Sequence, residues 1–172
     1  MQTLEAIHSR RSIRAFTDDP VSDEDLETII KAAGAAPSGG NDQMWIFVSM
    51  RDKKRIAALR ALSPGIVGKP TAIIAMCLDK RLQTTNPEGS MDVMQRYDIG
   101  AALENISLAA HDIGLGSCAI GSFHPQAVSS FLKLPENVEP CLLVVIGKPK
   151  AIPRGPRKRP IEEIHFHEKY EG

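Results

Sequence analysis

Two clusters of basic residues near opposite ends of the chain have the residue types that bind phosphate. They comprise Arg10, Arg11, Ser12 and Arg14 at one end, and Arg157 and Arg159 at the other. Guanidinium groups present several N–H donors in a planar fork that matches phosphate oxygens, and a serine hydroxyl adds a further donor. The clusters therefore indicate either one phosphate site that draws on both ends or two solvated charged surfaces.

A second segment of interest is the loop PSGGNDQ at 37–43. It begins with the rigid Pro37 and Ser38, and its two glycines let a ligand approach the backbone closely. The amides of Asn41 and Gln43 can both donate and accept hydrogen bonds, which suits the edge of a heterocycle. A plain turn between a helix and a strand is the alternative interpretation.

The common catalytic and metal-binding signatures are absent from the sequence. It has no GxxxxGK[ST] phosphate loop, no GxGxxG, no HExxH, no CxxC and no GxSxG. His165 and His167 are two residues apart, but no further ligand stands nearby, so we expect no metal site. Cys77, Cys118 and Cys141 each lie in an apolar stretch and are expected to be reduced core thiols.

The composition predicts a single globular domain over residues 1–172, since 42% of the residues are hydrophobic and 24% are charged. Its 21 basic and 21 acidic residues balance, which gives no overall field toward nucleic acid or an anionic membrane. The longest apolar runs are far shorter than the roughly 20 residues that span a bilayer. The first residues lack the apolar core of a signal peptide, so we expect a cytoplasmic protein with no nucleic-acid or membrane partner.

The elements that position these residues follow from the spacing of apolar side chains and from capping residues. Helices are predicted after Thr3 as N-cap, from Ser22 as N-cap to about 36, from Asp52 to about 62, over about 92–113, and over 125–132. Strands are predicted over 45–48, 71–78, 117–120 and 141–146, with a polar loop over 80–90. The helix over 92–113 is apolar around much of its circumference and should be buried.

Residues 148–172 differ from the rest of the chain. Half of the residues over 148–159 are Lys or Arg and three more are Pro, so this basic tail is predicted to run extended over the surface. Strands and helices alternate or nearly so before it. The order predicts a sheet covered by helices, of the α/β or α+β class.

Four segments follow one another in order along nearly the whole chain: RRSIRAF at 10–16, APSGGNDQMW at 36–45, ENISLAAHDIGLGSCAIGSF at 104–123 and RKRPIEEI at 157–164. Together they resemble the nitroreductase family of flavin mononucleotide (FMN) enzymes. The resemblance implies an α+β fold with a central, mostly antiparallel sheet flanked by helices. It also implies an intertwined homodimer with two FMN sites at its interface.

The resemblance further implies a role for each site residue. Arg10, Arg11 and Ser12 would hold the phosphate and ribityl chain of FMN, with Arg14 near the pyrimidine side of the ring and Arg157 and Arg159 returning to the phosphate. Pro37, Ser38, Asn41 and Gln43 would come from the opposite subunit, and Ala119, Ile120 and Gly121 would lie along the ring near its reactive nitrogen. Met44 stands where the family often has Pro, a departure that bears on the rigidity of the loop.

The implied activity is electron transfer from NADH or NADPH through FMN to nitroaromatics, quinones or similar electron-poor acceptors, with ping-pong kinetics. The flavin carries this chemistry, so no catalytic side chain is assigned. Two alternatives stay open. One is a specialised flavoenzyme of the same fold, for reductive dehalogenation or flavin breakdown; the other is a non-catalytic module that binds an anionic nucleotide or an acidic partner through the basic tail.

Overall fold

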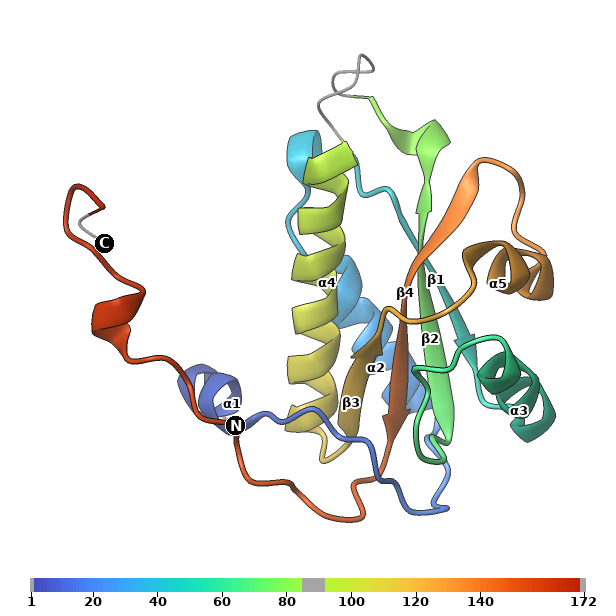
Figure 1. Cartoon of the computed structure of the whole chain (residues 1–172). Coiled ribbons are helices and arrows are strands. Elements are labelled where there is room, and N and C mark those ends of the chain that lie inside the picture. Colours follow the sequence, from blue (N-terminus) through green and yellow to red (C-terminus); the bar gives the residue numbers. More distant parts are fainter. Residues whose placement is uncertain (1, 85–91, 171–172) are drawn as a thin grey trace.

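A computed structural model describes residues 2–84 and 92–170 of the chain (Figure 1). Its α-helices are α1 (Thr3–Ser9), α2 (Asp23–Gly34), α3 (Lys53–Ala61), α4 (Asp92–Asp112) and α5 (Pro125–Leu132). Short 3-10 helices are η1 (Gly39–Asn41), η2 (Lys80–Leu82) and η3 (Ile161–Glu163). Residues 85–90 of the expected polar loop lie outside the described residues.

The strands form one antiparallel sheet. They are β1 (Trp45–Met50), β2 (Ala72–Asp79), β3 (Gly116–Ile120) and β4 (Val138–Gly147), in the spatial order β1-β2-β4-β3. Because β3 lies at one edge of this order, its outer side is open to other partners. The α+β class and the mostly antiparallel sheet that the family resemblance implies are confirmed.

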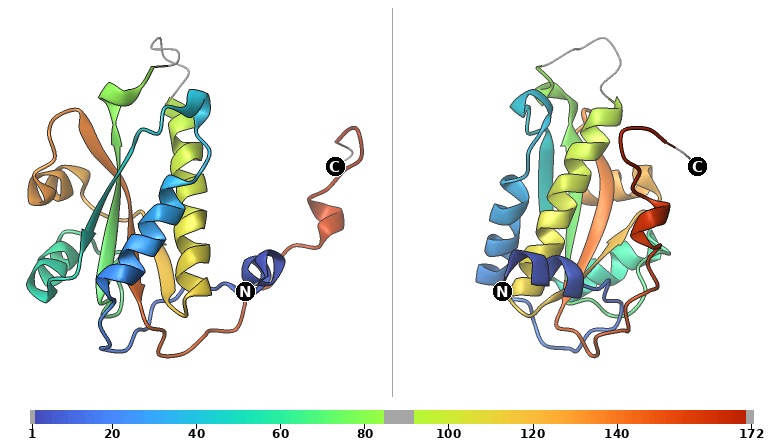
Figure 2. Two further views of the ribbon diagram at one scale, coloured as in Figure 1. Left: turned by 180° about the vertical axis from the view of Figure 1, so that it is seen from behind. Right: turned by 90° about the vertical axis from the view of Figure 1, so that its left-hand side faces the viewer.

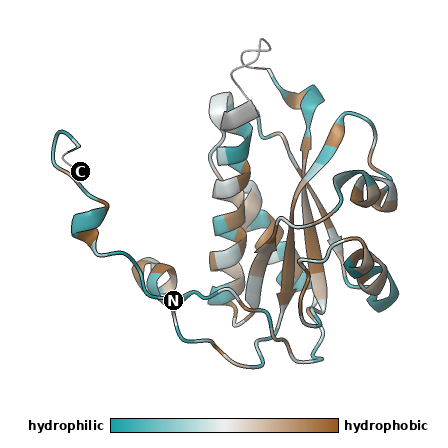
Figure 3. Ribbon diagram, in the orientation of Figure 1, coloured by the Kyte–Doolittle hydropathy of each residue, from teal (hydrophilic) through white to brown (hydrophobic). Residues whose placement is uncertain are grey.

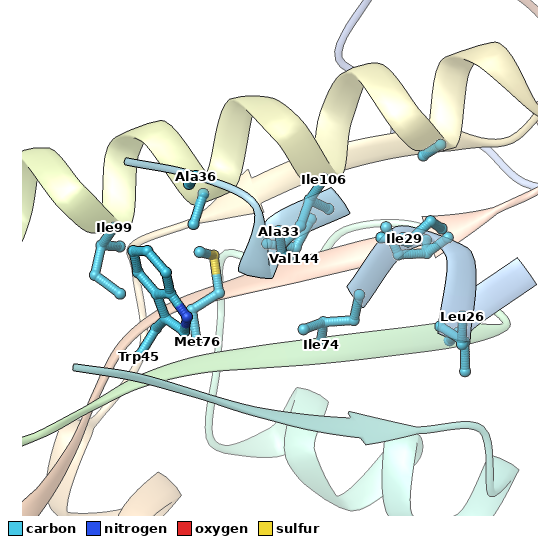
Figure 4. Close-up of a cluster of buried hydrophobic side chains, with 14 of the residues drawn as sticks. Leu26, Ile29, Ala33, Ala36, Trp45, Ile74, Met76, Ile99, Ile106 and Val144 are labelled. Carbon is cyan, nitrogen blue, oxygen red and sulfur yellow. The ribbon is translucent and has the colours of Figure 1, made fainter. Parts of the chain in front are cut away.

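Helices cover both faces of the sheet, with α2 and α4 on one face and α3 and α5 on the other (Figures 1 and 2). Side chains alternate between the faces of a strand. Ile74 and Val144 therefore pack toward α2 and α4, while Ile73 and Val145 pack toward α3 and α5. Figure 3 shows that the middle strands are predominantly hydrophobic. Figure 4 shows Ile29 of α2 in the buried hydrophobic cluster between the sheet and helices α2 and α4.

The local signals for helix ends work as predicted at three helices. Ser22 accepts a hydrogen bond from the backbone N–H of Asp25, whose side chain accepts one in return, which completes a capping box at α2. Asp52 caps α3 through the N–H of Arg55, and Pro125 opens α5. Each cap satisfies backbone groups that a helix end leaves without partners.

Two predicted boundaries are wrong. Thr3 does not cap α1: the N-cap is Gln2, and no side chain makes a capping hydrogen bond there. The last strand begins at Val138 and not at Cys141, because its first residues pair with Leu78 and Asp79 at the end of β2. Pairing with a distant strand is not visible in a local hydrophobic run.

The tail that follows β4 leads away from the sheet and passes beside α1 (Figures 1 and 2). Residues 151–160 form neither helix nor strand. Apolar side chains of the tail are exposed, among them Ile152, Ile161, Ile164 and Tyr170. Among the described residues, no helix combines the length and apolar character needed to cross a bilayer.

Candidate functional site

The segment that carries the N-terminal basic cluster runs along the outer edge of β3. Ser12 forms a parallel bridge with Ser117, and the N–H of Ile13 donates to the Ser117 carbonyl at 2.9 Å. The segment approaches closely because Gly116 has no side chain: a Cβ there would lie 2.5 Å from Ile13 Cγ1. Gly116 and this bridge therefore fix where the basic cluster lies.

The two adjacent arginines of this cluster have different surroundings. Arg10 donates from Nε to Glu104 Oε1 at 3.1 Å, and neither of its terminal nitrogens has an acceptor among the described residues. Arg11 donates from Nη1 to the carbonyls of His8 and Arg10, at 2.7 and 2.8 Å, and lies against Gly155 of the tail. Arg11 thus ties the end of α1 to the tail, whereas Arg10 presents free donors.

Helix α4 holds this end of α1 with one row of polar side chains. Glu104 binds Arg10, and His111 Nε2 lies 2.7 Å from the hydroxyl of Ser9. Residues seven apart lie on nearly the same side of a helix, since one turn takes about 3.6 residues. The sequence alone offers no partner for His111, and only the packing of α1 on α4 reveals one.

A second row on α4 holds the loop over 37–43 and the last turn of α2. Both carboxylate oxygens of Asp98 accept from the N–H of Gly39 at 3.2 Å, and Asn105 Nδ2 donates to the carbonyl of Ala32 at 2.9 Å. Neighbouring helix positions point about 100° apart, so this row lies on a different face from the row of Glu104. The contact at Asp98 also lies about 20 Å along the axis from that at His111.

The loop itself has an unusual backbone. Gly40, Asn41 and Gln43 have φ angles of 58°, 60° and 48°, in the left-handed region that non-glycine residues seldom adopt. The hydroxyl of Ser38 accepts from the N–H of Gln43 at 3.1 Å and closes the turn. Pro37, Asn41 and Gln43 are exposed.

Met44, which follows this loop, is buried, and its carbonyl accepts from the N–H of Asp79 at 2.8 Å. The loop is therefore anchored at both ends, at Gly39 and at Met44.

The end of β3 offers a free backbone edge. Ser117 directs its carbonyl outward to Ile13, and in an antiparallel strand the residue two positions on faces the same way. Ala119 is exposed and has no backbone partner on that side within the described chain. Ile120 is buried in the core, while Gly121 is exposed again. The strand thus presents backbone groups at Ala119 and Gly121, a few residues beyond the basic cluster.

The C-terminal basic residues lie further along the tail. Arg159 donates to the side chain and carbonyl of Glu163, at 3.2 and 2.6 Å, and Arg157 is exposed. In the described parts of the chain neither contacts Arg10 or Ser12. The structure therefore brings together the N-terminal cluster and the end of β3, but not the loop over 37–43 or the arginines of the tail.

Two hollows adjoin this region. A small one of about 110 Å³ lies between the end of α1, the end of α4, the start of β3 and the tail, and is lined by Ser9, Arg10, Arg11, Ile13, Ser107, His111, Gly114, Leu115, Ser117, Pro149 and Ile152. A larger one of about 580 Å³ includes Leu142, which neighbours Gly121, together with Lys80, Arg96 and Cys141. Burial raises the pKa of the Cys141 thiol to about 11, so the thiol is protonated at neutral pH.

Comparisons with known proteins agree with the fold. The nitroreductase family model matches residues 7–84 and 63–148. A provisionally named NADH dehydrogenase/NAD(P)H nitroreductase of Archaeoglobus fulgidus is 37% identical over 155 residues, 87% of this chain and 86% of the relative. The FMN reductase [NAD(P)H] of Bacillus subtilis is 30% identical over 187 residues, 98% of this chain and 74% of the relative.

Solved structures give the same result. The crystal structure of a nitroreductase family protein from Clostridium difficile superposes with a TM-score of 0.87 at 27% identity, over 99% of this chain and 100% of the other. Fold and sequence together define an α+β protein of the nitroreductase type. The chain belongs to the nitroreductase family, which confirms the family predicted from the four sequence segments.

Proposed function

We propose that the protein is an NAD(P)H-dependent oxidoreductase that binds FMN and reduces electron-poor acceptors such as nitroaromatics and quinones. The observation that carries the proposal is the pair of free terminal nitrogens on Arg10, beside the exposed Ser12 and next to an unpaired strand edge. The names of the relatives in Archaeoglobus fulgidus and Bacillus subtilis support the same donor and the same flavin.

The residues of the site fit the phosphate, the reactive edge of the ring and the pyrimidine side of FMN. Arg10 and Ser12 supply a cation and a hydroxyl for the phosphate. The unpaired backbone at Ala119 and Gly121 supplies N–H donors for the ring and orients its reactive nitrogen. The Arg14 guanidinium would lie near the pyrimidine side, where it stabilises negative charge that develops on reduction.

When bound, FMN accepts a hydride from NADH or NADPH and passes the electrons to a second substrate. The protein's own residues bind and orient the ring, so the proposal needs no acid, base or nucleophile. The large hollow, whose wall includes the Leu142 that neighbours Gly121, fits an aromatic acceptor, because Leu142 and Ile99 offer apolar walls while Arg96 offers a cation for oxygen substituents. Cys141 in its wall is a neutral thiol at neutral pH.

A second copy of the chain completes the site in this proposal. The loop over 37–43 and the end of α1 are held on different faces of α4: along its axis, the Asp98 contact lies about 9 Å from Glu104, which holds Arg10, and about 20 Å from His111, which contacts Ser9. This arrangement separates them within one protomer. A twofold dimer brings the Pro37, Ser38, Asn41 and Gln43 of one copy to the Arg10 and Gly121 of the other. Arg157 and Arg159 would then complete the phosphate site from the tail.

Exposed apolar side chains support an intertwined dimer. Leu4 and Ile7 of α1, Tyr97 of α4 and Ile161 of the tail are all exposed, with 70% of Leu4 accessible. Such groups are costly to leave in water when they gather over neighbouring elements. We propose that the domain over 1–172 pairs with a second copy through α1, α4 and the tail.

The same proposal places the protein in the cytoplasm. Cys77, Cys118 and Cys141 are all free, as expected where thiols are kept reduced. The nicotinamide donor is also an intracellular metabolite.

The test is an absorbance spectrum of the purified protein, recorded without oxygen. We expect a flavin spectrum that NADH or NADPH bleaches and that a nitroaromatic or a quinone restores. A flavin that nicotinamide does not reduce would support the specialised flavoenzyme instead. A protein that binds no flavin even after incubation with FMN would support the non-catalytic module.

A further inference from the structure

Helix α1 makes little apolar contact with the rest of the chain. Of its seven residues only Ala6 is buried, while Leu4 and Ile7 are exposed. Arg10 follows this helix directly, so hydrophobic packing alone does not fix where its side chain points. The contacts from α4 must supply that orientation.

The first of these contacts fixes the backbone just before Arg10. The Ser9 hydroxyl donates to the carbonyl of Glu5 at 2.6 Å, and its oxygen lies 2.7 Å from His111 Nε2, within hydrogen-bond distance. The Ser9 contact pins the last residue of α1 to α4.

The second contact orients the guanidinium itself. Glu104 Oε1 accepts from Nε of Arg10 and leaves both terminal nitrogens without an acceptor among the described residues. A guanidinium is planar and rigid, so holding Nε fixes the direction in which the other two nitrogens point. They are then available together for one phosphate group.

We propose that Glu104 is a positioning residue for the phosphate of FMN, acting through Arg10. The inference rests on the proposed FMN site and adds a residue to it that does not touch the flavin. A preorganised side chain loses less conformational freedom when its ligand binds, which strengthens binding. Because the Glu104 side chain is 49% exposed, solvent and salt screen its repulsion of the phosphate.

Comparing FMN with riboflavin distinguishes a role of Glu104 toward the phosphate from a general effect on the structure, because riboflavin has the ring and ribityl chain of FMN but lacks the phosphate. Apoprotein is titrated with each, and binding is followed by quenching of flavin fluorescence. In Glu104→Ala we expect FMN to bind about tenfold more weakly, the size of one charge-assisted hydrogen bond, with riboflavin changed less than about twofold. Glu104→Gln keeps an acceptor for Nε and should bind FMN within about threefold of wild type.

Matched variants complete the test. Glu24→Ala removes an exposed glutamate of α2 that pairs with nothing among the described residues, and should leave both affinities unchanged. In an Arg10→Ala background, Glu104→Ala should have no further effect on FMN, since positioning needs the arginine. Circular dichroism confirms that each variant is folded.

The outcomes distinguish the positioning role from the proposed function. Equal weakening of FMN and riboflavin in Glu104→Ala, unchanged FMN binding, or tighter FMN binding would each overturn the positioning role. If wild-type protein binds FMN no more tightly than riboflavin, the phosphate site itself is wrong and the proposed function fails with it.

Discussion

Gly68 holds the loop after α3 against the segment of the basic cluster, and its replacement tests this packing directly. Its φ is +74°, and a Cβ there would lie 2.1 Å from the carbonyl oxygen of Arg14. Alanine in a left-handed conformation costs about 1–2 kcal/mol, and the Arg14 carbonyl must also move by about 1 Å to reach an ordinary contact distance. We expect Gly68→Ala to lower the free energy of unfolding by about 2–4 kcal/mol.

Urea unfolding followed by the fluorescence of Trp45, the single tryptophan, measures this change. Gly34→Ala is the control: this glycine ends α2, nothing lies within 4 Å of its added Cβ, and alanine should raise stability by up to about 0.5 kcal/mol. A Gly68→Ala variant within about 0.5 kcal/mol of wild type would refute the close approach of the two segments. Displacement of Arg14 in this variant should also change the reduction potential of bound flavin, while Gly34→Ala should not.

Three further predictions concern charge and capping. Arg14→Met should lower the flavin midpoint potential and the rate of reduction by NAD(P)H, with a smaller loss of FMN than in Arg10→Ala. A potentiometric titration measures the potential and stopped-flow reduction measures the rate. An unchanged potential would show that Arg14 does not lie near the flavin ring. Hydrogen bonds from Arg81 hold the pKa of Asp79 well below its usual range, so Asp79 contributes stability above about pH 4 that is lost as the pH falls. The Asp79→Asn variant should therefore be less stable than wild type at neutral pH and should lose less stability on acidification. Thermal midpoints measured across the acid range test this, and parallel curves of midpoint against pH for the two proteins would contradict it. Ser22→Ala removes one half of the capping box and should cost about 1 kcal/mol in urea unfolding, with no change in FMN affinity.

The sequence predicts those features of the fold that depend on local chemistry. Ser22 and Asp52 start helices because their side chains accept hydrogen bonds from N–H groups a few residues ahead. Gly114, with φ of +80°, follows α4 as a terminating glycine should. The run over 72–78 is apolar at every position, which is typical of a strand that is buried on both faces of a sheet, and β2 is buried in this way.

Features that depend on tertiary contacts were not predictable in the same way. Nothing near Arg10 in the sequence points to Glu104, ninety-four residues away. The sequence does contain polar residues seven apart, at 98 and 105 and at 104 and 111, in a helix that is apolar around much of its circumference. Such spacing shows that two residues share a face, but not which segment that face meets.

The central claim is that each flavin site takes Arg10 from one copy of the chain and Asn41 from the other. Differently tagged Arg10→Ala and Asn41→Ala subunits are refolded together, and dimers that carry both tags are isolated. A shared site predicts one intact and one doubly altered site in each mixed dimer, so FMN content and activity should reach about half of wild type while each parent variant stays low. Mixed dimers that bind no more FMN than the parent variants would contradict the shared site.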